Sequence, residues 1–314
     1  MGFIFDFLGS IFGYILWFFF DAVSNYGLAI LIFTLIVNII MFPVMLKSRK
    51  SMAASAKLSS KQMELKKKFG NDQKKYNEEL AKLYEKEGVN PMKGCLTSFL
   101  PLIILSGVIG AINRPLKNTL HIPQEKIASS VEMISKVPGI GSSVSSNYQE
   151  LEIVRMYPQI KEHLTMFNEE ELADIEEYSS GFDFCGMNLL DRPNQSGFKS
   201  TLWIIPLLCF LGQSVSMFIA QKLNGTQPEM QGQGCMKIMP YGLALFTAYI
   251  AYTTPGAVGL YWVIGSMIGI IQNLIFSKYY NAHTLNAKAE AERVALLEIL
   301  EKDVREIKNP NEVK

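Results

Sequence analysis

Apolar residues gather in long blocks along this 314-residue chain, and these blocks limit what it can fold into. Hydrophobic residues make up 49% of the sequence and charged residues only 19%, which is more apolar than an ordinary soluble domain. A helix of about 20 residues, rising about 1.5 Å per residue, matches the roughly 30 Å hydrocarbon core of a bilayer. The blocks therefore predict an all-α, polytopic membrane protein.

Five blocks are long enough to be predicted spans: residues 27–46, 95–113, 202–221, 236–252 and 256–276. Only Thr253 to Gly256, "TTPG", separates the last two, which predicts a very tight turn. The predicted regions around the spans are an N-terminal helix (1–26), a basic loop (47–94), a long loop (114–201), a short loop (222–235) and a tail (277–314).

The N-terminal block, residues 3–20, lacks both the basic start and the small-residue cleavage site of a signal peptide. Asp6, Gly9, Ser10 and Gly13 recur at helical spacing and form one polar, small-residue stripe. This pattern predicts an interfacial helix in the headgroup plane, with a sixth span as the alternative.

The two longest loops differ in charge, one being basic and the other acidic. Residues 47–94 carry 13 basic and 6 acidic residues, whereas residues 114–199 carry 8 basic and 13 acidic residues. The positive-inside rule then predicts a cytoplasmic basic loop, an N-terminus outside and a cytoplasmic C-terminus.

The basic loop is predicted to form a helical hairpin. A Lys-rich helix over 48–69 is followed by a turn, and Asp72 caps a second helix that runs to about Glu87. Two interpretations of its charges remain open: a binding surface, or a solvated face held near anionic lipid.

The remaining soluble regions carry weaker patterns. Within residues 114–199, Asn168 and Glu171 predict a capping box and one helix. In the tail, Leu297, Leu300, Val304 and Ile307 have heptad-like spacing. They predict an amphipathic helix that docks on a partner or on the hairpin, with a free, frayed tail as the alternative.

Catalytic chemistry is not supported by the residue pattern. The five predicted spans contain no Asp, Glu or His, and the chain has no Walker-type phosphate-binding motif. The four cysteines form no CxxC pair, and the three histidines share no ligand-like spacing. We therefore expect neither an enzyme nor a bound metal or cofactor.

Asn38 is the strongly polar side chain in the first predicted span, and an amide in hydrocarbon is costly unless it finds partners. It is either glue between helices or part of a polar surface. Thr34 lies four residues earlier on the same helix face, which favours a surface.

Several motifs resemble the YidC family of membrane protein insertases. They are "YGLAILIFTLIVNIIMFP", "LYEKEGVNPMKGCLTSFLP", "MNLL" and "KIMPYGLALFTAYIAYTTPGAVGLYWVIGSMIGIIQN". The resemblance covers nearly the whole chain except most of residues 115–180. It implies a five-span bundle around a hydrophilic groove, open to the cytoplasm and to lipid, through which nascent membrane proteins enter the bilayer without nucleotide hydrolysis.

The resemblance also implies the site residues and partners. The groove residues that would contact substrate are Thr34, Asn38, Gln213, Tyr261 and Trp262, with a basic mouth of Lys47, Arg49 and Lys50. Expected partners are nascent membrane proteins and the lipid bilayer, with the Sec translocon and the ribosome as further candidates and no DNA. The expected location is the bacterial plasma membrane.

One departure stands out. Many family members carry an arginine where this chain has Asn38, so attraction of acidic substrate tails by that arginine does not transfer to this chain. Two other functions remain open: a small-solute transporter or channel, and a scaffold for membrane assembly factors. Without the motif match, Tyr261 and Trp262 are more typical of core or interfacial-belt positions.

Overall fold

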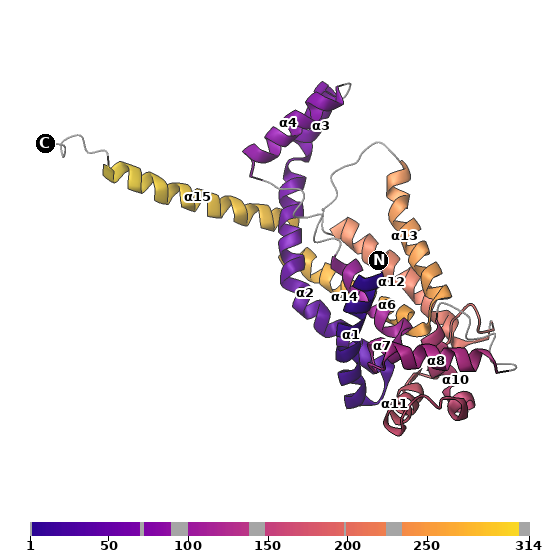
Figure 1. Ribbon diagram of the computed structural model, residues 1–314. Coiled ribbons are helices and arrows are strands. Elements are labelled where there is room, and N and C mark those ends of the chain that lie inside the picture. The colour runs from indigo at the N-terminus through magenta and orange to yellow at the C-terminus, as the bar shows by residue number, and fades with distance from the viewer. Residues whose placement is uncertain are drawn as a thin grey trace. The chain divides into compact units, whose positions relative to one another are not determined.

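The computed structural model describes residues 2–69, 72–88, 100–137, 148–197, 199–223 and 234–307, and it is mostly helical (Figure 1). The longer helices are α1 (Gly2–Val23), α2 (Tyr26–Lys57), α3 (Ser59–Phe69), α4 (Gln73–Lys86), α6 (Leu100–Asn113), α12 (Ile204–Leu223), α13 (Gly234–Thr253), α14 (Gly256–Tyr279) and α15 (Ala282–Ile307). Between α6 and α12 lie α7 (Pro115–Asn118), α8 (Gln124–Ser135), α10 (Gln149–Ile160), η1 (Lys161–His163), α11 (Glu169–Ser180), β1 (Asp183–Phe184), β2 (Met187–Asn188) and η2 (Thr201–Trp203).

The chain forms two compact units. The first contains Met1–Met41, Phe99–Met217 and Gly234–Ile270, and the second contains Phe42–Ser98, Phe218–Gln233 and Ile271–Lys314. The helices α2, α12 and α14 each contribute residues to both units.

Four helices in the described part of the chain are long and apolar enough to cross a membrane: Asp6–Val23, Tyr26–Ser51, Thr201–Ala220 and Gly256–Tyr279. Three of them overlap the predicted spans at 27–46, 202–221 and 256–276. The predicted span at 236–252 lies within α13, and residues 100–113 of the predicted second span form the shorter α6. Residues 95–99 lie outside the described part, so the five-span arrangement stays a prediction.

The small-residue stripe of α1 packs against α6 and α7 in the first unit. A Cβ added at Gly13 would lie 2.0 Å from the backbone oxygen of Asn118, and one at Gly9 would lie 3.0 Å from the backbone of Gly110. Asp6 accepts hydrogen bonds from Arg114 at 2.6 Å and from Lys117 at 3.0 Å. This close packing explains the stripe whether α1 lies in the interface or crosses the bilayer.

Residues 114–197 contain far more structure than the sequence pattern predicts. Besides α11, whose Asn168–Glu171 capping box is confirmed, this segment forms α7, α8, α10 and the hairpin β1–β2. Tyr178 of α11 packs edge-on against Tyr26 of α2, with ring centroids 5.3 Å apart, and Phe182 stacks on Tyr26 at 4.3 Å. These buried aromatic rings fasten the segment to the start of α2.

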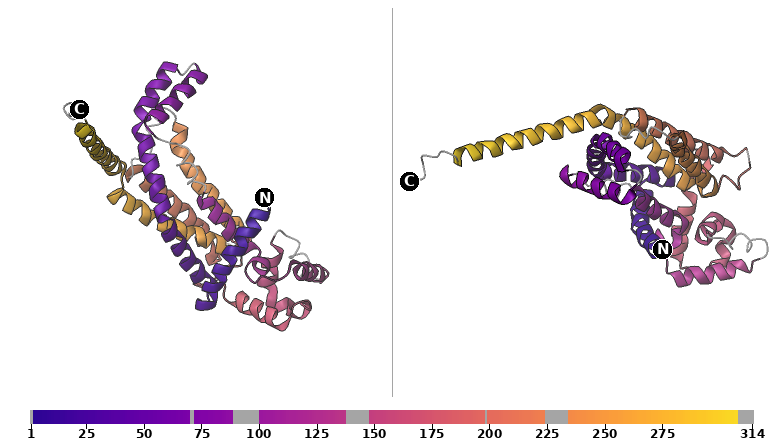
Figure 2. Two further views of the ribbon diagram at one scale, coloured as in Figure 1. Left: turned by 60° about the vertical axis from the view of Figure 1, so that its left-hand side comes forward. Right: turned by 90° about the horizontal axis from the view of Figure 1, so that it is seen from above.

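The basic segment forms two paired helices, α3 and α4, which lie side by side in both figures (Figures 1 and 2). Lys61 pairs with Glu87 at 2.5 Å, and Gln62 donates to the hydroxyl of Tyr84 at 3.1 Å. Asp72 caps α4 as predicted, accepting from the backbone of Lys75. The predicted helix over 48–69 is interrupted at Leu58, because α2 continues to Lys57 before α3 begins.

The tail forms one helix, α15. Leu297 and Leu300 are about half exposed.

The very tight turn predicted before the last span is also present, since α13 ends at Thr253 and α14 begins at Gly256.

Candidate functional site

Thr34 and Asn38 lie one turn apart on α2, and they are joined by a hydrogen bond. The Asn38 side-chain amide donates to the Thr34 carbonyl at 2.8 Å, while the Thr34 hydroxyl donates to the Ile30 carbonyl at 2.6 Å. Thr34 is fully buried and Asn38 is partly exposed. Part of the polar capacity of this face is therefore satisfied within the helix, and the partly exposed Asn38 side chain is the more accessible of the two.

Gln213, Tyr261 and Trp262 lie on α12 and α14, and all three are partly buried. The two aromatic residues pack against the hydrophobic core of the first unit. The structure thus places all five predicted groove residues in the first unit. Their contact with substrate remains a prediction.

Small residues bring α12 and α14 close together near these positions. A Cβ added at Gly212 would lie 2.3 Å from the Ser266 hydroxyl, and one at Gly259 would lie 2.5 Å from Ile205. The Cys209 thiol is 3.4 Å from the carbonyl of Gly259, to which it donates. Close backbone approach through small residues is a common way to pack helices in lipid, and here it fixes the two helices that carry Gln213 and Trp262.

The predicted basic residues differ in environment. Lys47 and Lys50 are exposed on α2, whereas Arg49 is partly buried and donates to the side-chain oxygen of Asn273 on α14. The Arg49 guanidinium also lies 4.4 Å from the centroid of the Phe276 ring. The sequence pattern missed this contact, because no local spacing relates residues so far apart in the chain.

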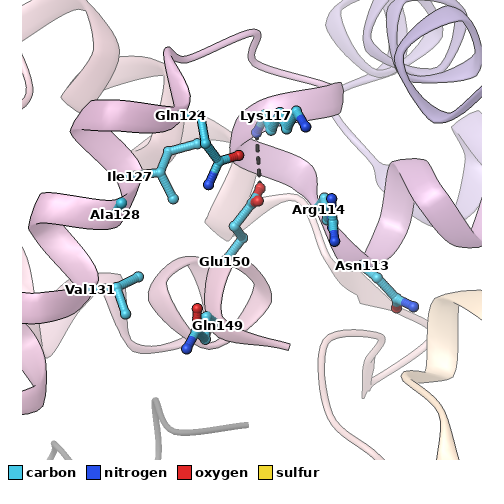
Figure 3. A pocket seen from close by; sticks show the side chains of 9 residues that line it. All are labelled: Asn113, Arg114, Lys117, Gln124, Ile127, Ala128, Val131, Gln149 and Glu150. Carbon is cyan, nitrogen blue, oxygen red and sulfur yellow. Dashed lines mark hydrogen bonds between the residues drawn. The ribbon is translucent and has the colours of Figure 1, made fainter. Parts of the chain in front are cut away.

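A polar pocket of about 720 Å³ lies among α6, α7, α8 and α10 (Figure 3). In the close-up, the Glu150 carboxylate points toward α7, where it accepts a hydrogen bond from the Lys117 backbone at 2.9 Å. Burial raises the pKa of Glu150 to about 7, although that hydrogen bond and the charges of Arg114 and Lys117 act against the rise. No local sequence pattern marks this carboxylate as buried.

The fold and the site residues together define a class: a helical, multi-pass membrane protein whose polar side chains lie on apolar helices. The family model described as 60Kd inner membrane protein matches residues 18–283. The chain belongs to this family, which includes the YidC insertases.

The chain is also similar in sequence to three named proteins. The membrane protein insertase YidC of Caldanaerobacter subterraneus subsp. tengcongensis is 26% identical over 266 residues, which cover 85% of this chain and 92% of that protein. The YidC insertase of Saccharophagus degradans is 25% identical over 82% of this chain but only 33% of its own length. The ALBINO3-like protein 1, chloroplastic, of Arabidopsis thaliana is 22% identical over 92% of this chain and 52% of its own length. The chain therefore spans nearly all of the first relative and a third to a half of the other two.

Proposed function

We propose that this protein is a membrane protein insertase of the bacterial membrane, which transfers nascent membrane proteins into lipid through a hydrophilic groove. Family membership carries this proposal, because the match extends over most of the chain. The residues proposed to line the groove are Thr34, Asn38, Gln213, Tyr261 and Trp262. Of these, Thr34 is fully buried, and its carbonyl accepts the hydrogen bond from Asn38. The protein is further proposed to do this without covalent chemistry or nucleotide hydrolysis.

The physical role of such a groove is to lower the cost of moving polar groups across hydrocarbon. An unpaired amide or hydroxyl costs several kcal/mol in an apolar medium. Water held beside Asn38 and Gln213 would reduce that cost over part of the bilayer thickness. The buried hydroxyl of Ser214, next to Gln213, has no hydrogen-bond partner among the described residues, and it is one more polar group that water in the proposed groove would satisfy.

Release into lipid needs no reaction. Burial of an apolar substrate helix provides roughly 25 cal/mol per Å² of apolar surface, so a substrate span is more stable in lipid than in a wet groove. We assign attraction of acidic substrate tails to the basic mouth of Lys47, Arg49 and Lys50. Lys47 and Lys50 are exposed, and Arg49 keeps its charge because the described groups it contacts, Asn273 and Phe276, are uncharged.

The proposed topology has the N-terminus outside and the C-terminus in the cytoplasm, supported by the excess of basic residues over 47–94. The hairpin α3–α4 then lies on the cytoplasmic side, where it would meet nascent chains, and the ribosome and the Sec translocon are candidate partners there.

Purified protein in vesicles should promote insertion of a labelled single-span peptide. Solute equilibration without insertion would instead favour a transporter or channel.

Replacing Asn38 tests whether insertion depends on an uncharged polar side chain at this position of the proposed groove. We expect Asn38→Leu to lower insertion of a single-span substrate several-fold, because it removes the partly exposed amide of this helix face. Asn38→Arg should improve insertion specifically for substrates with acidic tails, since it adds a charge that attracts them. Insertion is measured in vesicles, with Ile39→Leu as the matched control at an exposed apolar neighbour. Full activity of Asn38→Leu would assign Asn38 to packing alone.

A further inference from the structure

Residues 181–194, here called the clasp, bind the beginning of α2. The Tyr26 backbone donates to the carbonyl of Gly181 at 2.8 Å, and the Asn25 side-chain amide donates to the carbonyl of Asp183 at 2.7 Å. The Phe184 side chain occupies the space that a Cβ on Gly27 would need, 2.3 Å away. The start of α2 therefore rests directly on the clasp.

The same segment binds the beginning of α14 and the end of α13. Gly256 donates its backbone N–H to Asp191 at 2.9 Å, and Ala257 donates to Leu189 at 3.0 Å. In return, Asn194 of the clasp donates to the carbonyl of Tyr252 at 3.1 Å. The first N–H groups of a helix lack partners within that helix, so the clasp carbonyls satisfy groups that would otherwise be left open.

A buried ion pair ties the clasp to α10. Arg192 pairs with Glu152 at 2.5 Å, and their side chains are only 11% and 4% exposed. Arg155 pairs with Glu152 at 2.7 Å and lies 3.6 Å from Asp191. The Arg192 guanidinium also lies 4.8 Å from the Tyr148 ring centroid. Two ion pairs thus join the clasp to α10, Arg192–Glu152 and Arg155–Asp191. The first involves a nearly fully buried carboxylate, and losing one of its two arginine partners is expensive.

We propose that Glu152 and Arg192 are positioning residues for membrane protein insertion, acting through the clasp to fix the ends of α2 and α14 and hence Asn38, Tyr261 and Trp262. This inference rests on the proposed insertase function. It also gives residues 114–197 a role in insertion. Through the clasp, these residues hold in place α2 and α14, the helices that carry Asn38, Tyr261 and Trp262.

Two measurements on the full-length protein in vesicles test this inference. The first is amide hydrogen exchange of the peptide that contains Gly256 and Ala257, which needs no insertase activity. The second is insertion of a labelled single-span peptide. Arg192→Met removes the more buried of the two arginines that pair with Glu152 and leaves Arg155 alone to compensate its charge. Exchange at Gly256 and Ala257 should therefore rise at least tenfold, and insertion should fall about fivefold. Exchange near Gly265, deeper in α14, should stay unchanged.

The double variant Glu152→Leu/Arg192→Met removes both charges of this pair and leaves Arg155 with Asp191, so it should recover most of the protection and the insertion. If Arg192→Met does not fold, Asn25→Asp provides a milder change. It keeps the side-chain oxygen that accepts from Leu28 and replaces the donor to Asp183 by a carboxylate oxygen, which repels the Asp183 carbonyl. It should raise exchange at Tyr26 and lower insertion.

The outcomes distinguish a failure of the positioning role from a failure of the insertase function. Unchanged exchange, or raised exchange with full insertion, would overturn the positioning role of Glu152 and Arg192. Absence of insertion by the unmodified protein would instead refute the insertase function, while the exchange measurement would still test the clasp contacts.

Discussion

Raising the pH from about 5 to about 8 is expected to loosen the packing of α10 in the unmodified protein but not in Glu150→Gln. Glu150 is buried, and its pKa is about 7 instead of the ordinary 4.5. A carboxyl group whose pKa is higher in the folded state binds its proton more tightly there than in the unfolded state. Its contribution to stability is therefore complete below about pH 4.5 and is lost as the pH rises through about 7.

The size of this effect follows from the shift. One proton bound only by the folded state changes the free energy of unfolding by about 1.4 kcal/mol per pH unit, so the loss is on the order of 3 kcal/mol. Glu150→Gln keeps an oxygen that can accept from the Lys117 backbone and cannot ionise. Opening of α10 is measured by hydrogen exchange corrected for the intrinsic rate at each pH.

Glu125→Gln is the matched control, because Glu125 is an exposed carboxylate at the start of α8. It should keep the pH dependence of the unmodified protein. A flat profile for the unmodified protein, or an equal slope in Glu150→Gln, would show that Glu150 does not couple pH to this packing.

Gly13→Ala is the second variant with a large expected effect. The added methyl would lie 2.0 Å from the backbone oxygen of Asn118, so α1 and α7 must move apart. The clash is with backbone atoms, which a side-chain rotation cannot relieve. We expect the free energy of unfolding, measured by SDS titration in mixed micelles, to fall by about 2–3 kcal/mol.

Gly242→Ala controls for the change in helix propensity. Gly242 lies within α13, and a Cβ there would meet no described atom within 4 Å. Alanine is the better helix former, so this variant should be unchanged or more stable by up to about 1 kcal/mol. Equal stability of the two variants would show that the contact between Gly13 and Asn118 is not limiting.

Local patterns were sufficient for the parts of the fold that depend on near neighbours in the chain. The apolar blocks predicted the positions of α2, α12 and α14, and the spacing of Asn168 and Glu171 predicted the cap of α11. Asp72 was identified in the same way, because a cap and its helix are adjacent in sequence.

Contacts between distant segments could not be predicted in this way. Carbonyls of the clasp satisfy the start of α14 about 65 residues away, and backbone acceptors of this kind leave no mark in the sequence. The stripe that contains Gly9 and Gly13 is visible in the sequence, but its packing partners on α6 and α7 are not, so the pattern alone predicts an interfacial helix. The groove residues were predicted from family motifs, and the fold places them in one unit without testing their contact with substrate.

Photo-crosslinking to a stalled nascent membrane protein tests the central claim most directly. A crosslinker is placed in turn at Asn38, Gln213 and Trp262, and in matched variants at Ile39, Leu211 and Met267, exposed apolar residues on the same three helices. The groove account predicts crosslinks to the polar part of the substrate from the first set and much weaker ones from the second. Crosslinks confined to the second set would contradict it.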